Sequence, residues 1–112
     1  MKTRDIGNLG EDLACGYLYA NDFKIIARNW KNRWCEIDII ARKVNTIYFI
    51  EVKYRQTDSF GSGFDYITHA KLKQMTFAAE LWLANYSWDL DSCLAAISVS
   101  GQTNSVSMVT IS

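Results

Sequence analysis

The chain has 112 residues, of which 49% are hydrophobic and 21% are charged, and its formal net charge is zero. This composition predicts one compact domain over residues 1–112 and excludes a disordered chain. The neutral total charge also argues against tight binding of nucleic acid by bulk electrostatics alone. Because no apolar run approaches the roughly 20 residues of a membrane helix and the N-terminus lacks a signal-peptide pattern, we expect a cytoplasmic protein without a membrane partner.

The first predicted element is a helix over residues 5–20, where hydrophobic residues recur at helical spacing. Glu11 lies beside Leu18 on an ideal helix, and Asp12 faces the other way. We therefore expect Glu11 to point toward the body of the protein and Asp12 toward water. Gly10 costs helix stability but would let the helix backbone approach a sheet closely. The expected buried stripe consists of Ile6, Leu9, Leu13, Tyr17 and Ala20, widened by Ala14 and Leu18.

Residues 34–55 carry the most informative pattern of the chain. Two β-branched, apolar runs flank a short polar break at residues 43–45, which predicts a hairpin. If Arg42 pairs with Ile47 around the turn, Asp38 falls opposite Glu51. Because side chains two residues apart share a face of a strand, the same register gathers a cluster of acids and bases on one face, namely Glu36, Asp38, Glu51, Lys53 and Arg55.

This cluster has two interpretations. Cross-strand ion pairs on a solvated sheet face are common and contribute a few tenths of a kcal/mol up to about 1 kcal/mol. Aspartate is disfavoured inside strands, however, yet Asp38 lies in the middle of a strong one. Neighbouring carboxylates also repel each other, and burial disfavours their charge further. The excess of acid over base at the centre of the cluster therefore favours a divalent cation or a reaction.

The spacing resembles the nuclease signature written PD…(D/E)-x-K, with Asp38 on one strand and Glu51-Val52-Lys53 on the next. The rest of the chain supports this resemblance over about residues 5 to 85. The ordered motifs Gly7–Ala14, Glu36–Ala41, Phe49–Arg55, Phe60-Gly61 and Lys71 resemble the small bacterial YraN-type family. That family is similar to archaeal Holliday-junction resolvases and to restriction-endonuclease-like folds.

The resemblance implies an α/β, restriction-endonuclease-like fold with a mixed central sheet flanked by helices, in the order αβββαββ. The remaining predicted elements are a strand over residues 23–30, a second helix over residues 65–85 and closing strands over residues 93–99 and 106–111. The second helix should bury Ile67, Met75, Ala78, Ala79 and Trp82 and turn Lys71 inward. We expect the polar loop over residues 56–63 to overhang the site.

The activity predicted from these residues is Mg²⁺- or Mn²⁺-dependent hydrolysis of phosphodiester bonds in DNA. Asp38 and Glu51 would bind the metal, because oxygen-rich ligation suits a hard cation. Lys53 would orient the metal-bound water and offset charge in the transition state. Glu11 is a candidate outer or second-metal ligand, and Glu36 is a weaker one. By resemblance, Lys71 would contact phosphate or support the site.

Basic side chains near this cluster could form a rim for a phosphate backbone. The predicted nucleic-acid contacts are Arg33, Arg55, Lys71 and Lys73, and the expected partners are DNA and, as an option, a second copy of the chain. One alternative is a module with the nuclease fold that binds nucleic acid without cutting it. Another is a purely structural protein with a salt-bridged sheet.

Overall fold

The computed structural model describes residues 3–56, 64 and 66–112, with side chains from residue 8 onward. Their elements follow the predicted order αβββαββ: α1 (Thr3–Ala20), β1 (Lys24–Lys31), β2 (Glu36–Lys43), β3 (Thr46–Arg55), α2 (His69–Tyr86), β4 (Asp91–Ser100) and β5 (Val106–Thr110). Helix α2 begins later than predicted because Thr68 caps it, accepting a hydrogen bond from the backbone N–H of Lys71. Residues 57–63 of the loop expected over the site lie outside the described residues.

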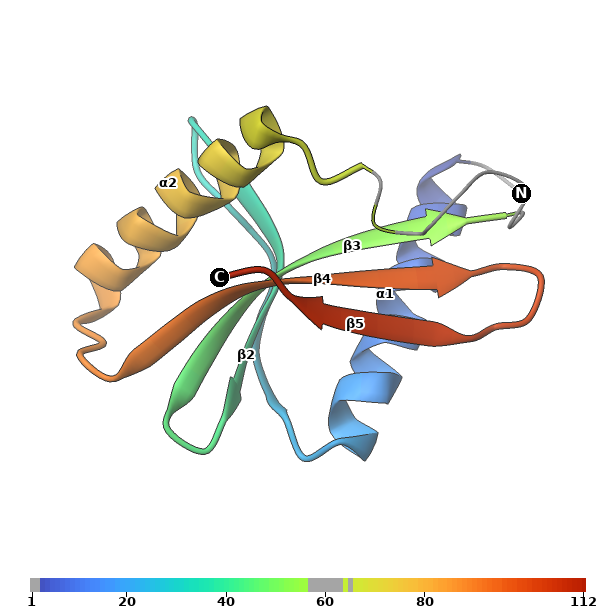
Figure 1. Ribbon diagram of the computed structural model, residues 1–112, viewed down its shortest axis with the longest axis horizontal. Helices are drawn as coiled ribbons and strands as arrows, with labels where there is room; N and C mark the ends of the chain where they lie inside the picture. The colour runs from blue at the N-terminus through green and yellow to red at the C-terminus, as the bar shows by residue number, and fades with distance from the viewer. Residues whose placement is uncertain (1–2, 57–63, 65) are drawn as a thin grey trace.

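The five strands form one mixed sheet in the order β1-β2-β3-β4-β5. All neighbouring strands are antiparallel except β3 and β4, which are parallel and are therefore joined through α2. Figure 1 shows a strongly twisted sheet with α1 and α2 set apart on its two sides. The fold is α/β, with a five-stranded mixed sheet between two helices. Neither helix in the described part of the chain is long and apolar enough to cross a membrane.

Two hydrophobic cores lie on opposite faces of the sheet, one under each helix. Neighbouring residues of β3 point to different cores, so that Phe49 packs in the α2 core and Ile50 in the α1 core. Helix α2 buries four of the five residues predicted for it, Met75, Ala78, Ala79 and Trp82. The fifth, Ile67, precedes the helix and packs against the same core.

The buried stripe of α1 differs from the predicted one. Gly10, Ala14 and Leu18 are buried, whereas Leu9 is exposed. The reason is close packing, because a Cβ at position 10 would lie 2.7 Å from the Cβ of Tyr54 on β3. Gly10 and Ala14 therefore allow the close contact at one end of the helix, and Leu18 fills the core further along it. The expected close approach of helix to sheet at Gly10 is confirmed.

The hairpin register is confirmed, but the two strands separate near Asp38. Arg42 pairs with Ile47 as predicted, and the β2–β3 ladder ends where Ile39 pairs with Ile50. The expected pairs beyond that point, Asp38 with Glu51 and Glu36 with Lys53, are not strand partners in this ladder. The strict alternation of β2 also fails here, since Ile37 packs in the α2 core and Ile39 in the α1 core. Asp38 thus lies at a fork between two strands.

The neighbouring strand β1 bends at the same level. Arg28 pairs with Ile39 and Trp30 with Ile37, so Asn29 lies beside Asp38 along the sheet. The backbone of Asn29 has a φ of 53°, in the left-handed region that asparagine tolerates better than most residues. This residue interrupts the extended backbone of β1 at the level where the alternation of β2 is lost.

Candidate functional site

Asp38 is fixed at the fork by the backbone of β3. Its Oδ2 accepts a hydrogen bond of 2.8 Å from the N–H of Val52. Because the ladder has already ended, the carboxylate supplies an acceptor that a strand partner would otherwise give. Burial, followed by the nearby charge of Glu51, raises the pKa of Asp38 to about 7, while the Val52 hydrogen bond and Lys71 act in the opposite direction. A buried acid with this pKa favours a proton or a cation beside it.

Glu51 follows on β3 and points to the α2 side of the sheet. Its Oε1 lies 2.8 Å from Nζ of Lys71, in the first turn of α2. Both side chains are partly buried, so this ion pair is less screened than a surface pair. The expectation that Lys71 points inward is confirmed.

Glu11 approaches from α1, on the other face of the sheet. It is only 8% exposed, whereas Asp12 is exposed, as predicted. Arg28 on β1 donates to both carboxylates, with Nε 3.1 Å from Glu11 and Nη2 2.7 Å from Asp12. The charge of Glu11 contributes to the raised pKa of Asp38. Glu11 therefore lies within electrostatic range of Asp38 but already has a cationic partner, and its role as a ligand stays a prediction.

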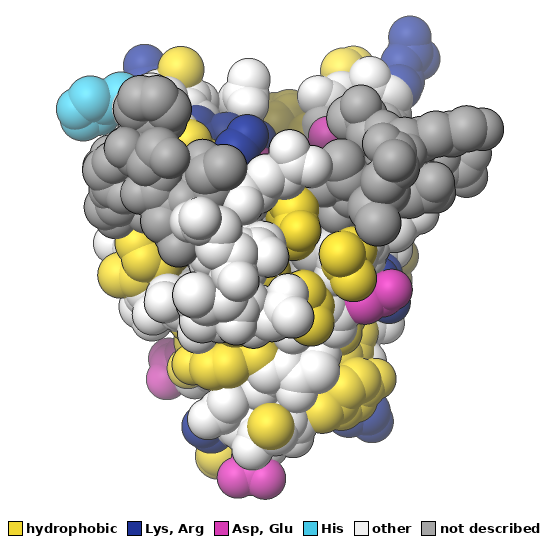
Figure 2. All heavy atoms as spheres, turned by 90° about the vertical axis from the view of Figure 1, so that its right-hand side faces the viewer, with side chains coloured by type: hydrophobic (Ala, Val, Ile, Leu, Met, Phe, Trp, Pro, Cys, Tyr) yellow, Lys and Arg dark blue, Asp and Glu magenta, His cyan; other side chains and the backbone are white. Residues whose placement is uncertain are grey.

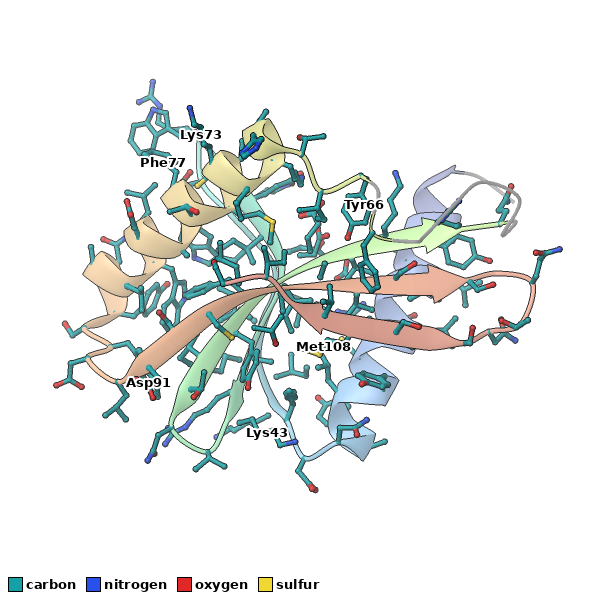
Figure 3. All side chains as sticks on the ribbon, in the orientation of Figure 1. Lys43, Tyr66, Lys73, Phe77, Asp91 and Met108 are labelled. Atoms are coloured by element: carbon teal, nitrogen blue, oxygen red, sulfur yellow. The ribbon has the colours of Figure 1, made fainter. Side chains whose placement is uncertain are left out.

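Lys53 is more exposed than the two carboxylates. Its Nζ lies 5.9 Å from the ring centroid of Tyr66, so it contacts the aromatic face. The Tyr66 hydroxyl donates to the backbone oxygen of Glu51 at 3.3 Å. Burial, together with the charges of Glu51 and Asp38, raises the pKa of Tyr66, which therefore stays a neutral phenol. Tyr66 borders the candidate site from the segment before α2, beside β3 (Figure 3).

No sequence pattern points to Tyr66, because this residue lies in an irregular segment without periodicity. From the sequence, we expect the ammonium group beside the two carboxylates to be that of Lys53. Among the described ion pairs, the lysine that contacts Glu51 is Lys71. The place of Lys53 in the chemistry stays a prediction.

Glu36 contributes to a cavity on the α2 side of the fork. Glu36, Glu51 and Lys71 line this cavity, which has a volume of about 380 Å³. Its walls come from the β1–β2 turn and from α2. Glu36 and Glu51 thus line the same cavity without being strand partners, and their close clustering stays a prediction.

The predicted nucleic-acid contacts divide into two places. Lys71 lines the cavity, and Lys73 lies near Phe77 on the same helix (Figure 3). Arg33 is exposed on the β1–β2 turn at the opposite wall. Arg55 is at the far end of β3, where its backbone oxygen accepts from the N–H of Gly101. Of the four predicted contacts, Lys71 lines the cavity, and Lys73 and Arg33 lie on the helix and the turn that supply other lining residues.

The donor groups at the fork fit a hard divalent cation. Asp38 and Glu51 offer carboxylate oxygens, and their mutual repulsion is relieved by added positive charge. Among the described residues, no three His, Cys, Asp or Glu side chains gather as a metal-binding group. Two carboxylates with backbone oxygen and water suit Mg²⁺, which keeps several of its waters and needs only one or two protein carboxylates.

Comparison with known proteins identifies the family. A protein of Fusobacterium nucleatum named as a UPF0102 protein is 46% identical over 86 residues, which cover 77% of this chain and 68% of that protein. UPF0102 proteins of Vibrio campbellii and Geobacter metallireducens are 38% and 39% identical over 104 and 106 residues, covering 88% and 91% of this chain and 85% and 86% of theirs. The model of the uncharacterised protein family UPF0102 matches residues 10–103. The expectation of a YraN-type protein is therefore confirmed, and the chain belongs to the UPF0102 family.

Proposed function

We propose that the protein is a Mg²⁺- or Mn²⁺-dependent nuclease that hydrolyses phosphodiester bonds in DNA, with branched repair or recombination intermediates as its substrates. The observation that carries this proposal is the half-buried Asp38 carboxylate, held at the fork near Glu51 with a pKa of about 7. Perturbed carboxylates with a defined charged neighbour are typical of functional sites. The Glu51-Val52-Lys53 sequence on the adjacent strand and the αβββαββ order of a mixed sheet support a restriction-endonuclease-like nuclease.

The residues have separate tasks in this mechanism. Asp38 and Glu51 would hold the metal, with Glu11 as an outer ligand behind Asp38. A bound divalent ion supplies Lewis acidity toward the scissile phosphate and lowers the pKa of a coordinated water. Lys53 would orient the attacking water and offset negative charge as it develops on the phosphate. Lys71, which pairs with Glu51 in the structure, would also reach a phosphate oxygen.

A specific observation supports a second candidate, a nucleic-acid-binding module that does not cleave. Glu51 is paired with Lys71, and Glu11 with Arg28. These pairs compensate two of the three acids without a metal. In this case the nuclease fold would serve only to hold DNA through the basic residues around the cavity.

The decisive experiment combines metal binding with cleavage. Calorimetric titration with Mn²⁺ should give a binding isotherm for the parent and a much weaker one for Asp38→Asn. Cleavage of linear, flapped and four-way DNA should require the metal and be lost in the same variant. The matched control is Asp89→Asn, which removes an exposed carboxylate before β4 and should leave both signals unchanged.

The outcomes separate the candidates. Metal binding without cleavage of any substrate would reject the nuclease and leave the binding module. Equal Mn²⁺ affinity in the parent and in Asp38→Asn would remove Asp38 from the metal centre.

A further inference from the structure

Two aromatic side chains face solvent on the same cavity beside the candidate metal centre. Trp34 on the β1–β2 turn is 67% exposed, and Phe77 on α2 is 47% exposed. Both line the cavity of about 380 Å³ that also contains Glu51 and Lys71. Burying a large aromatic side chain stabilises a protein by about 1.5–3 kcal/mol, so two that remain exposed at one site indicate a surface that binds something.

The turn that carries Trp34 is held in place by its own hydrogen bonds. Oδ1 of Asn32 accepts from the backbone N–H groups of Trp34 and Cys35, at 2.8 and 3.0 Å. The N–H of Asn32 in turn donates to the oxygen of Cys35 at 3.0 Å. The guanidinium of Arg33 lies 5.2 Å from the Trp34 ring centroid. Trp34 is therefore presented on an ordered turn with a cation beside it.

The charges of the cavity select among ligands. Lys31 and Lys71 line it and favour an anion at their side. Glu36 and Glu51 line it as well, and Glu51 is paired with Lys71, so the cavity wall carries charges of both signs. An acidic peptide would carry its charge into these carboxylates, and a purely apolar helix would leave all four charged groups desolvated. A ligand with a flat, uncharged ring and a phosphate on one end matches this arrangement.

We propose that this cavity binds one unpaired nucleobase of the DNA substrate, stacked against Trp34 and Phe77, with the adjoining phosphate at Lys31 and Lys71. This inference rests on the proposed function, because the nuclease proposal is what makes DNA the ligand. A ring within a duplex is stacked on both sides and is not free to enter, so a substrate must supply a base from a single-stranded segment, a flap or a junction. The substrate class that this cavity indicates is therefore DNA with an unpaired nucleotide beside the scissile phosphate.

The test measures binding without metal, so that it does not depend on cleavage. Fluorescence anisotropy of a labelled short single-stranded oligonucleotide, titrated in EDTA, should show binding to the parent, and the matching labelled duplex should bind more weakly. Trp34→Ala and Phe77→Ala should each weaken single-strand binding by about 5- to 150-fold, the effect of losing one stacked base. Trp34→Phe keeps an aromatic face and should retain most of the affinity.

Two controls isolate stacking from general effects. Tyr19→Ala removes an aromatic side chain that is 64% exposed on α1, away from the cavity, and should bind as the parent does. An oligonucleotide of abasic sugar-phosphates should bind the parent and the two alanine variants alike, because it has no ring to stack. Circular dichroism on each variant confirms that its fold is intact.

The results distinguish failure of this inference from failure of the nuclease proposal. Unchanged single-strand affinity in both folded alanine variants would overturn base binding, even if DNA is cleaved. Loss of single-strand affinity in those variants would support it, even if the parent cleaves no DNA. Equal affinity of the parent for single strand, duplex and abasic chain would also overturn it.

Discussion

At the scale of single residues, Asp38 is the feature on which the proposed chemistry depends. Its carboxylate lies at the point where β2 and β3 separate and is bonded to the Val52 N–H. Burial and Glu51 favour its protonated form, so the residue binds a proton more readily in the folded chain than in the unfolded one. Proton and metal therefore compete for the same oxygen atoms.

The raised pKa of Asp38 predicts that the stability of the metal-free protein depends on pH. The folded-state pKa of Asp38 is about 7, against about 3.9 in an unfolded chain. The contribution of Asp38 to the free energy of unfolding is fully present below about pH 4 and is lost as the pH rises to about 7. Over this range the free energy of unfolding falls by up to about 1.4 kcal/mol per pH unit. Urea denaturation in EDTA at several pH values between 4 and 8 should show this fall relative to Asp38→Asn. Parallel pH profiles for the two proteins would contradict the raised pKa.

Replacing Glu51 tests the repulsion between the carboxylates. Glu51→Gln keeps the size of the side chain and removes its charge, so the pKa of Asp38 should fall toward its ordinary value, because its charged neighbour is gone. The variant also loses the ion pair with Lys71, which opposes any gain in stability. Carbon-detected NMR titration of Asp38 measures its pKa directly. An unchanged pKa would show that burial alone raises it.

Lys53→Met tests the lysine of the signature. The change keeps the aliphatic stem and removes the charge, so Mn²⁺ and DNA should still bind while cleavage falls by at least about a hundredfold, the scale of one lost preorganised electrostatic group. Parallel calorimetry and single-turnover cleavage assays measure both effects. Lys24→Met, at the exposed start of β1, is the control for loss of one basic charge. Full cleavage by Lys53→Met would exclude this lysine from the mechanism.

At the scale of elements, the sequence predicts the hairpin well and the fork poorly. Strand periodicity and the turn chemistry at residues 43–45 give the register from Arg42–Ile47 onward, because they describe regular pairing. The β2–β3 ladder ends beside Asp38, at the level where the backbone of Asn29 on the neighbouring strand is left-handed. That conformation is a tertiary feature, and an asparagine in a strand pattern does not by itself indicate it. Tyr66 was missed for a related reason, since its position depends on how the chain enters α2.

The contact of α1 with β3 predicts opposite effects for two glycines of the same helix. Gly10→Ala would place a Cβ 2.7 Å from the Tyr54 Cβ, so the helix must shift, which typically costs about 1–3 kcal/mol. At Gly16 a Cβ would meet nothing within 4 Å, so Gly16→Ala should stabilise the helix by up to about 1 kcal/mol. Thermal denaturation of both variants measures the difference. Equal melting temperatures would show that α1 is not tightly packed at Gly10.

At the scale of the whole molecule, charge is unevenly distributed. All twelve Lys and Arg residues lie between Lys2 and Lys73, and no charged residue follows Asp91. Figure 2, which looks at the end of the sheet that carries the β4–β5 turn, shows hydrophobic and neutral side chains between scattered charges. Whether two copies associate stays a prediction that light scattering can test.

Metal binding at the fork should stabilise the whole domain. A ligand at a hundred times its dissociation constant stabilises the folded state by about 2.7 kcal/mol if it does not bind the unfolded chain. Saturating Mn²⁺ should therefore raise the melting temperature of the parent by several degrees and leave Asp38→Asn unchanged. Calorimetric scans with and without Mn²⁺ provide the measurement. An equal shift in both proteins would point to binding elsewhere.

The position of Asp38 and Glu51 in one hairpin has a consequence for the order of folding. A hairpin forms within about 1–10 μs, whereas the parallel pairing of β3 with β4 must wait for the long connection through α2. The two strands that carry the acids therefore pair before the sheet closes, and we expect the repulsion between the acids to act on the folding transition state as well as on the final structure. Neutralising Asp38, by Asp38→Asn or by acid, should speed folding in stopped-flow refolding experiments more than it slows unfolding.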